Sequence, residues 1–444
     1  MDECNSIKYY YPIFETVRNK SFFWTFTVAL SGFLFGFDTV VISGANLLVK
    51  ELWNLSPFNH GMFIMSMALW GTVVGALASG RPIERYGRKT SLFVIGLLYL
   101  ISALGSAVAP DPYSFSFFRF IGGVGVGASS VAAPAYISEI SSASVRGRRV
   151  ALYQFNIVFG IFVAFISNYL LEGVGGSMDW RLMLGAEAIP ALVFCVLIRR
   201  IPQSPRWLAL KEDEAGIELI DSNVSIDQKN TRAGLFQHDL RKPLMLAFFI
   251  AFFNQWSGIN FILYYAPEIM DISGLASKES LWSSIFIGLV NLVFTVLGIN
   301  LIDRLGRRQL LILGSIGYIL SLFAVAYGFK QDLSSTYLLV FLCLFIASHA
   351  IGQGAVIWVF ISEIFPTAYR ARGQAFGSGV HWVLAAFITL ITPVFLDGDN
   401  GIFKDNPWPI FAFLGGLMVV QLIWVLWKVP ETKGVELEEI QQTM

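Results

Sequence analysis

The sequence predicts an all-α membrane protein in which twelve transmembrane helices form two pseudo-symmetric six-helix bundles. Three observations support this fold class. First, 55% of the 444 residues are hydrophobic and only 14% are charged, whereas a soluble chain carries roughly 25% charged residues. Second, the chain contains many apolar runs of about the 20 residues that a helix needs to cross a bilayer. Third, two sequence patterns each occur twice, about 220 residues apart.

The repeated patterns combine acidic and basic residues at the ends of apolar runs. The pattern YISEI…RGRR of residues 136–149 returns as FISEI…RAR at 360–372, and RYGRK at 85–89 returns as RLGRR at 304–308. Two patterns repeated in the same order at nearly one offset indicate a duplicated unit of about half the chain. Membrane transporters are commonly built from two such halves with the substrate between them. The repeat therefore favours a transporter.

Apolar windows give the predicted spans in order. They lie near 22–43, 61–80, 91–109, 114–138, 150–171, 182–199, 244–267, 282–302, 309–328, 336–362, 373–395 and 407–427. The first window is too long for a cleavable signal peptide and lacks a small-residue cleavage site followed by a soluble body. The expected parts of the chain are an N-terminal tail (1–21), an N-terminal bundle (22–199), a linker with short helices (200–243), a C-terminal bundle (244–427) and a C-terminal tail (428–444).

The distribution of basic residues predicts the orientation. With both tails and every second loop inside, the outer loops hold only Lys50, Arg181, Lys278, Lys330 and Lys404 of the 31 Lys and Arg residues. Cytoplasmic loops of membrane proteins carry an excess of Lys and Arg. Both termini are therefore expected in the cytoplasm.

No motif for catalysis or cofactor binding is present. The chain has no CxxC, no HExxH and no GxxxxGK[ST], and its Cys4, Cys195 and Cys343 give no disulfide framework. These patterns would indicate redox or zinc sites, metalloproteases or nucleotide binding. We therefore expect no cofactor, no metal and no enzymatic activity.

Asp38 in the first span and Arg119 in the fourth are predicted to pair. A carboxylate at the centre of a bilayer costs about 2.5–3.5 kcal/mol on insertion scales, so it needs a partner. Each charge lies about five residues from the outer end of its helix, which places both at similar depth at about 1.5 Å per residue. Apart from Glu187 in the sixth span, no other charges are clearly embedded in the first half.

Two readings of this pair remain open. It is either a fixed structural ion pair or a proton site in which Asp38 alternates between Arg119 and a proton. Intramembrane ionisable residues usually mark ion pathways. This tendency favours the proton site.

Polar and aromatic residues meet near the predicted midplane of the second half. Gln255, Asn291 and Trp382 each lie about ten residues, or roughly 15 Å, into their helices. Amides donate and accept hydrogen bonds, and aromatic rings cover apolar faces, so the set suits a polyhydroxylated, uncharged ligand. Hydrogen bonding between helices is the alternative, but it explains a cluster at one depth poorly. His349 is expected to be a hydrogen-bonded packing residue.

Several glycines are expected to have structural roles. Gly87 fits a tight turn between two helices that requires a positive φ. The glycines of 122–127 allow neighbouring helices to approach closely. Gly352 and Gly354 weaken the tenth span by about 1 kcal/mol each relative to Ala, which indicates a hinge or room for packing.

The motifs together resemble those of the sugar porter family of the major facilitator superfamily, over nearly the whole chain. Those that carry the resemblance are RYGRK and RLGRR, the RxxGGxGxG that begins at Arg119, the repeated ISEI segments, PQSPRWL at 202–208, QWSGIN at 255–260 and PETKG at 430–434. The resemblance implies the major facilitator fold and alternating access by rocking of the two bundles. It also implies a monosaccharide or a related polyol as substrate.

The resemblance also implies roles for individual residues. The implied sugar contacts are Gln154, Gln255, Asn260, Asn291, Trp358 and Trp382, with Phe35 as a weaker match and Asn254 and His381 as departures that touch the pocket. The implied gating residues are Tyr264 and Tyr265 on the outer side and Glu139, Arg146, Glu363, Arg370, Arg88 and Arg307 on the cytoplasmic side. An aspartate at Asp38 is similar to proton-coupled members, and Gln203 replaces the glutamate of the usual PESPR.

These observations predict a secondary active transporter that moves a neutral monosaccharide, hexose or pentose, together with a proton. A facilitative sugar or polyol uniporter is the alternative, and a transporter-like sugar sensor is a further one. The expected partners are the sugar, the proton and the lipid bilayer, without nucleic acid, and the expected working unit is a monomer. The expected location is the plasma membrane, as a bacterial inner-membrane protein.

Overall fold

The structure is a computed structural model that describes residues 3–142, 145–208, 211, 235, 237, 240–366, 369–396, 400–403 and 406–434, with side chains from Ser21 onward except that of Ala371. Most of the predicted linker, Lys404 and the end of the C-terminal tail lie outside the described residues. In the described part of the predicted linker, residues 205–208 are helical.

The first half of the described chain consists of helices only. They are α1 (Glu3–Trp53), α2 (Pro57–His60), the π-helical turn η1 (Gly61–Met65), α3 (Met67–Ala78), α4 (Gly80–Tyr86), α5 (Arg88–Val108), α6 (Pro112–Glu139), α7 (Arg146–Leu171), the 3-10 turn η2 (Gly176–Met178), α8 (Asp179–Gly185) and α9 (Ala188–Ile198). α1 begins well before the predicted window at 22, because a hydropathy window does not detect a polar helical extension.

The described second half is also helical. Its elements are α11 (Arg241–Trp256), α12 (Ile259–Ile272), α13 (Ser277–Leu305), α14 (Arg307–Lys330), α15 (Ser335–Ile351), α16 (Gln353–Ile364), α17 (Arg370–Leu396) and α18 (Trp408–Lys428).

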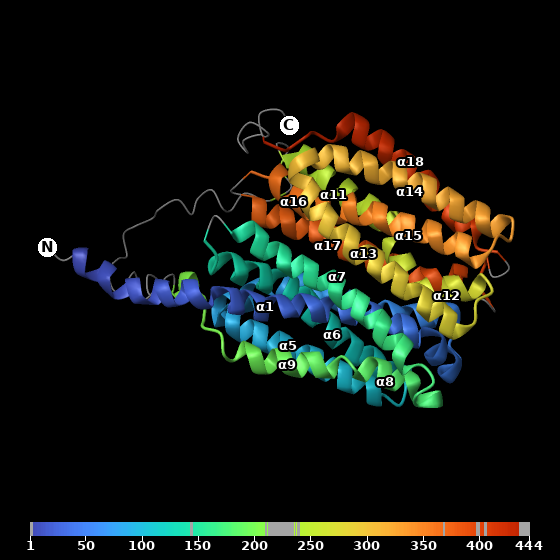
Figure 1. The fold of residues 1–444 in the computed structure, drawn as a ribbon, viewed down its shortest axis with the longest axis horizontal. Coiled ribbons are helices and arrows are strands. Elements are labelled where there is room, and N and C mark those ends of the chain that lie inside the picture. The colour runs from blue at the N-terminus through green and yellow to red at the C-terminus, as the bar shows by residue number, and fades with distance from the viewer. Residues whose placement is uncertain are drawn as a thin grey trace.

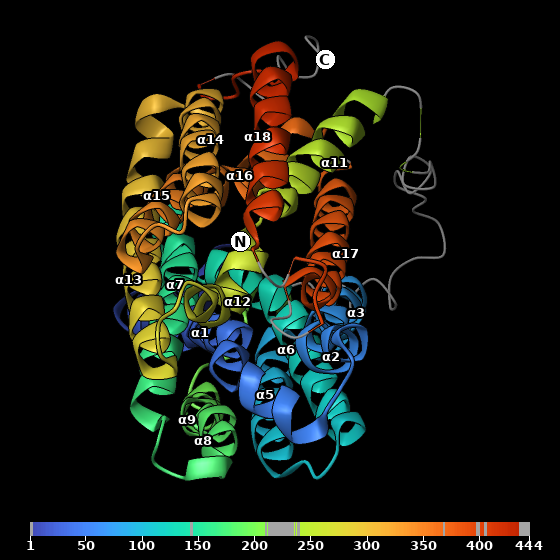
Figure 2. The ribbon, with the colours of Figure 1, turned by 90° about the vertical axis from the view of Figure 1, so that its right-hand side faces the viewer.

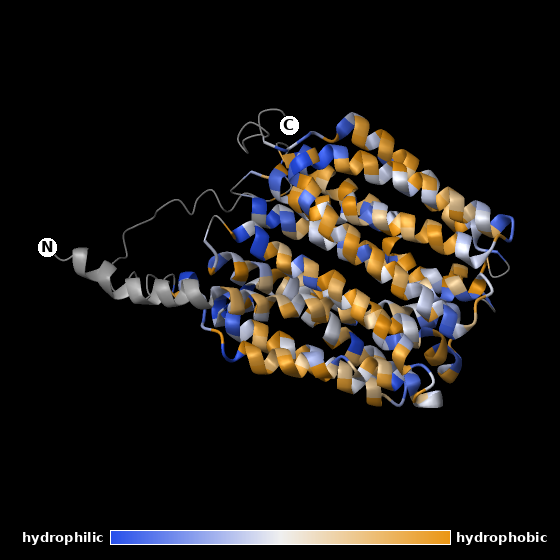
Figure 3. Ribbon diagram, viewed as in Figure 1, coloured by the Kyte–Doolittle hydropathy of each residue, from blue (hydrophilic) through white to orange (hydrophobic). Residues whose placement is uncertain are grey.

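The helices agree with the predicted number of spans. Over the described residues, 11 helical segments are long and apolar enough to cross a membrane, and the pair Pro57–Met65 and Met67–Ala78, bent by 42°, raises the number to as many as 12. Along these helices the apolar residues form long bands, and the hydrophilic residues gather at the ends (Figure 3). The predicted fold class is therefore confirmed.

Two predicted spans of the second half are broken. α11 and α12 meet at Gly258, whose φ of 93° is left-handed. α15 and α16 meet at Gly352, with φ −89° and ψ −105°. Glycine adopts such conformations at little steric cost because it has no Cβ. An added Cβ at Gly352 would also lie 2.8 Å from the Cα of Gly314, so the residue provides both a break and room for packing.

The two halves form two bundles that lie side by side (Figures 1 and 2). Extensive contacts between them, over the described residues, join α7 to α13, α3 and the α2–η1 turn to α17, and α1 to α12. The start of α1 and the end of α18 lie at one end of the molecule, and α12 lies at the other (Figure 1). We call that second end the far end; it corresponds to the predicted outer side.

The N-terminal bundle is packed backbone against backbone. An added Cβ at Gly36 of α1 would lie 1.8 Å from the carbonyl oxygen of Ile157 in α7, and one at Gly123 of α6 would lie 1.8 Å from that of Ala68 in α3. No side chain fits at such separations, so these helix pairs touch directly. This confirms the close approach predicted for the glycine-rich fourth span.

The sequence repeat reappears as a repeated turn. Gly87, between α4 and α5, has φ 86° and ψ 161°, and Gly306, between α13 and α14, has φ 92° and ψ 167°. Both conformations lie in the region that favours glycine. The positive φ predicted for Gly87 is confirmed, and its counterpart in the second half has nearly the same geometry.

Candidate functional site

Asp38 of α1 and Arg119 of α6 form a buried ion pair. Nη1 of Arg119 donates to the Asp38 carboxylate, and Nη2 donates to the backbone carbonyl oxygen of Asp38 at 2.9 Å. The exposed fractions are 1% for Asp38 and 2% for Arg119. The pairing predicted from depth along the two helices is therefore confirmed. Removing one partner of a buried pair typically costs about 3–5 kcal/mol, because the other charge is left uncompensated.

Glu187 adds a second carboxylate to this pair. It directly precedes α9, is 1% exposed and interacts electrostatically with both Asp38 and Arg119. Its Oε1 has no hydrogen-bond partner among the described residues. The buried group thus combines one guanidinium with two carboxyl groups. The sequence showed Glu187 as an embedded charge but gave no signal that it lies beside Asp38.

A cluster of amides surrounds the break between α11 and α12. Nε2 of Gln255 donates to Oδ1 of Asn254 at 3.0 Å, and Oε1 of Gln255 accepts from Nδ2 of Asn260 at 2.7 Å. Nε2 of Gln255 also lies 3.1 Å and 3.2 Å from the two ring nitrogens of His381 in α17. Because an amide nitrogen only donates, the His381 nitrogen that takes this bond is unprotonated. The structure therefore brings together four of the predicted sugar contacts.

Aromatic rings extend this cluster toward the N-terminal bundle. The ring of His381 lies 4.9 Å from that of Trp358 in α16 and 4.8 Å from that of Trp382. Trp382 in turn lies 5.7 Å from Phe35 of α1. These separations are typical of favourable ring contacts. The rings thus run from α16 and α17 in one bundle to α1 in the other. On α1, Phe35 lies three residues before Asp38.

Two predicted sugar contacts lie outside this cluster of described contacts. Asn291 is buried in α13, and its Oδ1 accepts a hydrogen bond from Thr295 at 3.5 Å. Gln154 is half-buried in α7. α7 and α13 contact each other across the bundle interface. Their contact with a sugar stays a prediction.

The two predicted gating tyrosines lie buried in α12. Tyr264 and Tyr265 are each 1% exposed. Tyr264 interacts electrostatically with Asp38 and Arg119, and the hydroxyl of Tyr265 donates to the backbone oxygen of Thr389 in α17 at 2.9 Å. α12 is therefore held against both the charged site and its own bundle.

The cytoplasmic charges that the resemblance implied include one described ion pair in each bundle. Arg88 Nη2 lies 2.9 Å from Glu139 in the first, and Arg307 Nη2 lies 2.7 Å from Glu363 in the second. Arg307 also bonds Glu363 through Nε at 3.1 Å, so this pair is bidentate. The two pairs occupy equivalent places in the two halves.

The other two predicted cytoplasmic residues begin the helices that follow. Arg146 is exposed at the start of α7, and Arg370 is half-buried at the start of α17.

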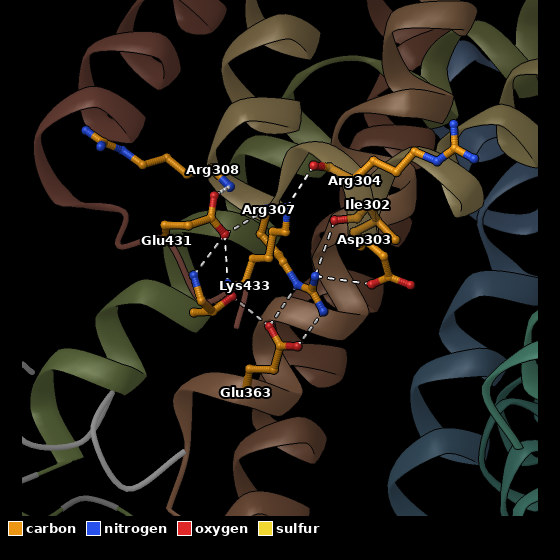
Figure 4. A network of polar contacts seen from close by, with 9 residues as sticks. Ile302, Asp303, Arg304, Arg307, Arg308, Glu363, Glu431 and Lys433 are labelled. Atoms are coloured by element: carbon orange, nitrogen blue, oxygen red, sulfur yellow. Dashed lines mark hydrogen bonds and ion pairs between the residues drawn. The ribbon is translucent and has the colours of Figure 1, made fainter. Parts of the chain in front are cut away.

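Glu431 of the PETKG segment completes the second of these sites (Figure 4). It accepts the backbone N–H groups of Arg307 at 2.9 Å and of Arg308 at 3.1 Å, which begin α14. In the first half Gln203 takes the same place, since its Oε1 accepts the backbone N–H of Lys89 at 3.2 Å. An anion at a helix N-terminus is stabilised by the helix dipole. The sequence motif PETKG was noted, but its capping role was not predicted.

His349 has the packing role expected of it. Its Nδ1 lies 2.6 Å from the hydroxyl of Tyr318 in α14. An added Cβ at Gly354 would lie 3.3 Å from the other ring nitrogen. The histidine thus joins α14 to the broken tenth span.

Comparison with known proteins identifies the family. A family model for sugar (and other) transporters matches residues 24–444. The arabinose-proton symporter of Bacillus subtilis is 33% identical over 440 residues, which cover 93% of this chain and 92% of the relative. The D-xylose-proton symporter of Escherichia coli is 32% identical over an alignment of 475 positions, which covers 96% of each chain.

Solved structures agree in fold. An inward-open structure of the xylose transporter of Escherichia coli matches with a TM-score of 0.81 at 31% identity, over 95% of this chain and 99% of that one. A partially occluded inward-open structure of the same transporter matches with a TM-score of 0.78 at 30% identity, over 93% and 98%. This chain therefore belongs to the sugar transporter family, and its two six-helix bundles have the major facilitator fold that its motifs predict.

Proposed function

We propose that this protein is a secondary active transporter that moves a neutral monosaccharide, hexose or pentose, across the membrane together with a proton. The observation that carries the proposal is the buried group of Asp38, Arg119 and Glu187, which holds one positive charge against two carboxylates. Ionisable residues buried within a membrane protein usually mark ion pathways, so the group favours proton coupling over a uniporter. Relatives named as symporters of arabinose, xylose and galactose with a proton support the same activity.

The sugar site is assigned to the amides and rings between the bundles. Gln255, Asn260, Asn254 and His381 already bond one another, so their hydrogen-bonding groups are positioned before a ligand arrives. Trp358, Trp382 and Phe35 supply aromatic faces, and Gln154 and Asn291 supply amides from the facing helices. The surroundings are neutral and hydrogen-bonding, as a sugar requires.

We attribute the coupling of proton and sugar transport to α1, which contributes a residue to each site. A proton on the Asp38 carboxylate removes the charge that holds Arg119, and the guanidinium is then free to turn toward Glu187. Phe35 lies one helical turn away on α1 and contacts Trp382. Loading the sugar site and neutralising the charged site therefore act on the same helix.

Alternating access assigns roles to the remaining residues. Tyr264 and Tyr265 close the outer side, where α1 meets α12. Glu139, Arg88, Arg146 and their counterparts Glu363, Arg307 and Arg370 hold the cytoplasmic side closed in the outward-facing state. The division into bundles at 22–199 and 244–427, with the linker at 200–243, supplies the two bodies that rock.

We also propose a bacterial inner-membrane location with both termini in the cytoplasm. The protein acts as a monomer, catalyses no covalent chemistry and binds no nucleic acid. The multi-pass membrane fold and the family support the location, and the positive-inside distribution of Lys and Arg supports the orientation.

Reconstitution in proteoliposomes tests this function. Labelled pentoses, hexoses and inositol are offered with and without an inward-directed proton gradient. We expect accumulation of one sugar above equilibrium only with the gradient. Asp38→Asn is expected to abolish accumulation and to retain sugar counterflow, because the neutral amide fixes the site in its uncharged form.

Asp332→Asn is the matched control, since Asp332 is exposed on a loop and has a φ of 49° that asparagine tolerates. Accumulation by Asp38→Asn equal to the wild type would overturn proton coupling. Counterflow without any effect of the gradient in the wild type would instead identify a uniporter.

A further inference from the structure

Three buried polar residues join the two bundles at the far end, away from the sugar and proton sites. Asn46 lies near the end of α1, His60 at the end of α2, and Glu268 in α12. Their exposed fractions are 2%, 1% and 7%. Asn46 and Glu268 are separated by 222 residues in the chain. None of the three carries a role in the sugar or proton site described above.

The contacts among them are short and directional. Nδ2 of Asn46 donates to Oε2 of Glu268 at 2.7 Å. Nε2 of His60 lies 2.5 Å from Oδ1 of Asn46. Because an amide oxygen only accepts, His60 is the donor in this contact. It thereby turns the Asn46 side chain so that its NH₂ group faces the carboxylate.

The surrounding backbone fixes these residues in place. The π-helical turn Gly61–Met65 directly follows His60. An added Cβ at Gly61 would lie 2.0 Å from the carbonyl oxygen of Leu390 in α17, so the turn packs directly on the other bundle. Glu268 lies three residues after Tyr265 in α12, and the Tyr265 hydroxyl donates a hydrogen bond to the backbone oxygen of Thr389 in α17. The triad therefore lies at a point where α1, the α2–η1 turn, α12 and α17 meet.

We propose that Asn46, His60 and Glu268 form an outer latch that stabilises the closed state of the outer side. His60 and Asn46 belong to one bundle and Glu268 to the other. When the outer ends separate, the His60–Asn46 contact is retained but the Asn46–Glu268 contact is lost, and the carboxylate meets external water. The latch rests on the proposed alternating access, to which it adds a gate element.

The chemistry of the bond explains why the latch is effective. A buried carboxylate must be hydrogen-bonded, and a hydrogen bond to a charged group is about twice as strong as a neutral one. In the closed state Asn46 supplies one such bond. Without it, closing the outer side buries Glu268 with one donor fewer, so the equilibrium moves toward the open state. His60 acts as a positioning residue for that donor.

The test measures the distance between the outer ends of the bundles. Spin labels are attached at Leu52→Cys in α1 and Ser277→Cys in α13, both exposed, in a background in which Cys4, Cys195 and Cys343 are replaced by serine. Double electron–electron resonance then gives the populations of short and long distances. The measurement uses no sugar and no proton gradient, so its result is independent of the substrate.

Asn46→Ala and Glu268→Ala are each expected to raise the ratio of long to short distances by about tenfold or more, the factor that corresponds to one hydrogen bond to a charged group. The double substitution is expected to shift the ratio no further than the larger single one, because both remove the same bond. Glu268→Gln keeps an acceptor oxygen and is expected to shift it less. His60→Ala is expected to shift it in the same direction.

Asn59→Ala and Glu279→Gln are the controls, because both side chains are exposed at the same end of the molecule. Elution of every variant as a single species in size-exclusion chromatography confirms folding. Distance distributions unchanged by Asn46→Ala and by Glu268→Ala, or additive shifts in the double variant, would overturn the latch. If the variants shift the distances but the wild-type protein transports no sugar, the latch is supported and the proposed sugar transport is wrong.

Discussion

A buried arginine that faces two carboxylates is the central feature at the scale of single residues. The depth of Asp38 and Arg119 was readable from sequence, because distance along a helix converts directly into depth in a bilayer. The position of Glu187 was not, since it depends on how the sixth span packs against the first and fourth. Sequence reasoning therefore identified two members of the charged group and recorded the third without a role.

The amide cluster was likewise only partly predictable from the sequence. Gln255, Asn291 and Trp382 were predicted to meet near the midplane. The structure joins Gln255 to Trp382 through His381, whereas the described hydrogen bond of Asn291 is with Thr295 of its own helix. That His381 accepts a hydrogen bond from Gln255 was not predictable, because the histidine tautomer depends on neighbouring side chains. Gln154 and Asn291 lie on α7 and α13, which contact each other across the bundle interface, and their contact with a sugar stays a prediction.

Gln255 offers a test at this scale. It bonds three neighbours and presents both amide atoms at the cluster. Gln255→Ala is expected to raise the KM for sugar counterflow about tenfold or more, since each lost neutral hydrogen bond contributes about 0.5–1.5 kcal/mol. Gln331→Ala, at an exposed site, is expected to leave KM unchanged. An unchanged KM in Gln255→Ala would exclude this residue from the sugar site.

At the scale of helices, the broken spans are the main departure from the predicted elements. Hydropathy treats residues 244–267 and 336–362 as continuous, because a break does not interrupt an apolar run. The glycines at the breaks are visible in sequence, but Gly354 and the glycines of 122–127 lie within unbroken helices. Composition alone therefore does not distinguish a break from close packing.

Gly258 should be intolerant of substitution. Its φ of 93° is left-handed, and an added Cβ would lie 2.7 Å from Cδ1 of Leu414 in α18. Gly258→Ala is expected to lower stability by about 1–2 kcal/mol from the backbone conformation alone. The fall is measured as the apparent Tm in detergent. Gly416→Ala, where an added Cβ meets nothing within 4 Å, is expected to leave Tm unchanged or to raise it. Equal Tm values for the two variants would contradict this account of the break.

At the scale of the whole molecule, the duplicated sequence becomes two similar but unequal halves. The repeat placed matching motifs in the two halves, and these form matching turns at Gly87 and Gly306 and matching ion pairs, because similar local sequence favours similar local structure. It did not predict the unequal caps. Glu431 accepts four backbone N–H groups, those of Arg307, Arg308, Thr432 and Lys433. Gln203 accepts only that of Lys89 among the described backbone groups.

Exchanging the two capping residues tests whether the difference between the caps affects stability. Gln203→Glu is expected to raise stability by about 0.3–1 kcal/mol, because a carboxylate at a helix N-terminus interacts favourably with the helix dipole. Glu431→Gln is expected to lower it by at least as much, since it weakens a more extensive set of bonds. Apparent Tm values in detergent at low salt measure both changes. A change of the same sign in the two variants would contradict the dipole argument.

The direct backbone contacts of the N-terminal bundle have a mechanical consequence. Helices that touch at Gly36 and Gly123 leave no room for a side chain between α1 and α7 or between α3 and α6, so we expect each of these pairs to move as a unit. On the proposed mechanism, a proton at Asp38 releases the Arg119 side chain without separating the helices of either pair. We therefore expect its effect on access to appear at the contacts between the bundles, such as those of α7 with α13 and of α1 with α12.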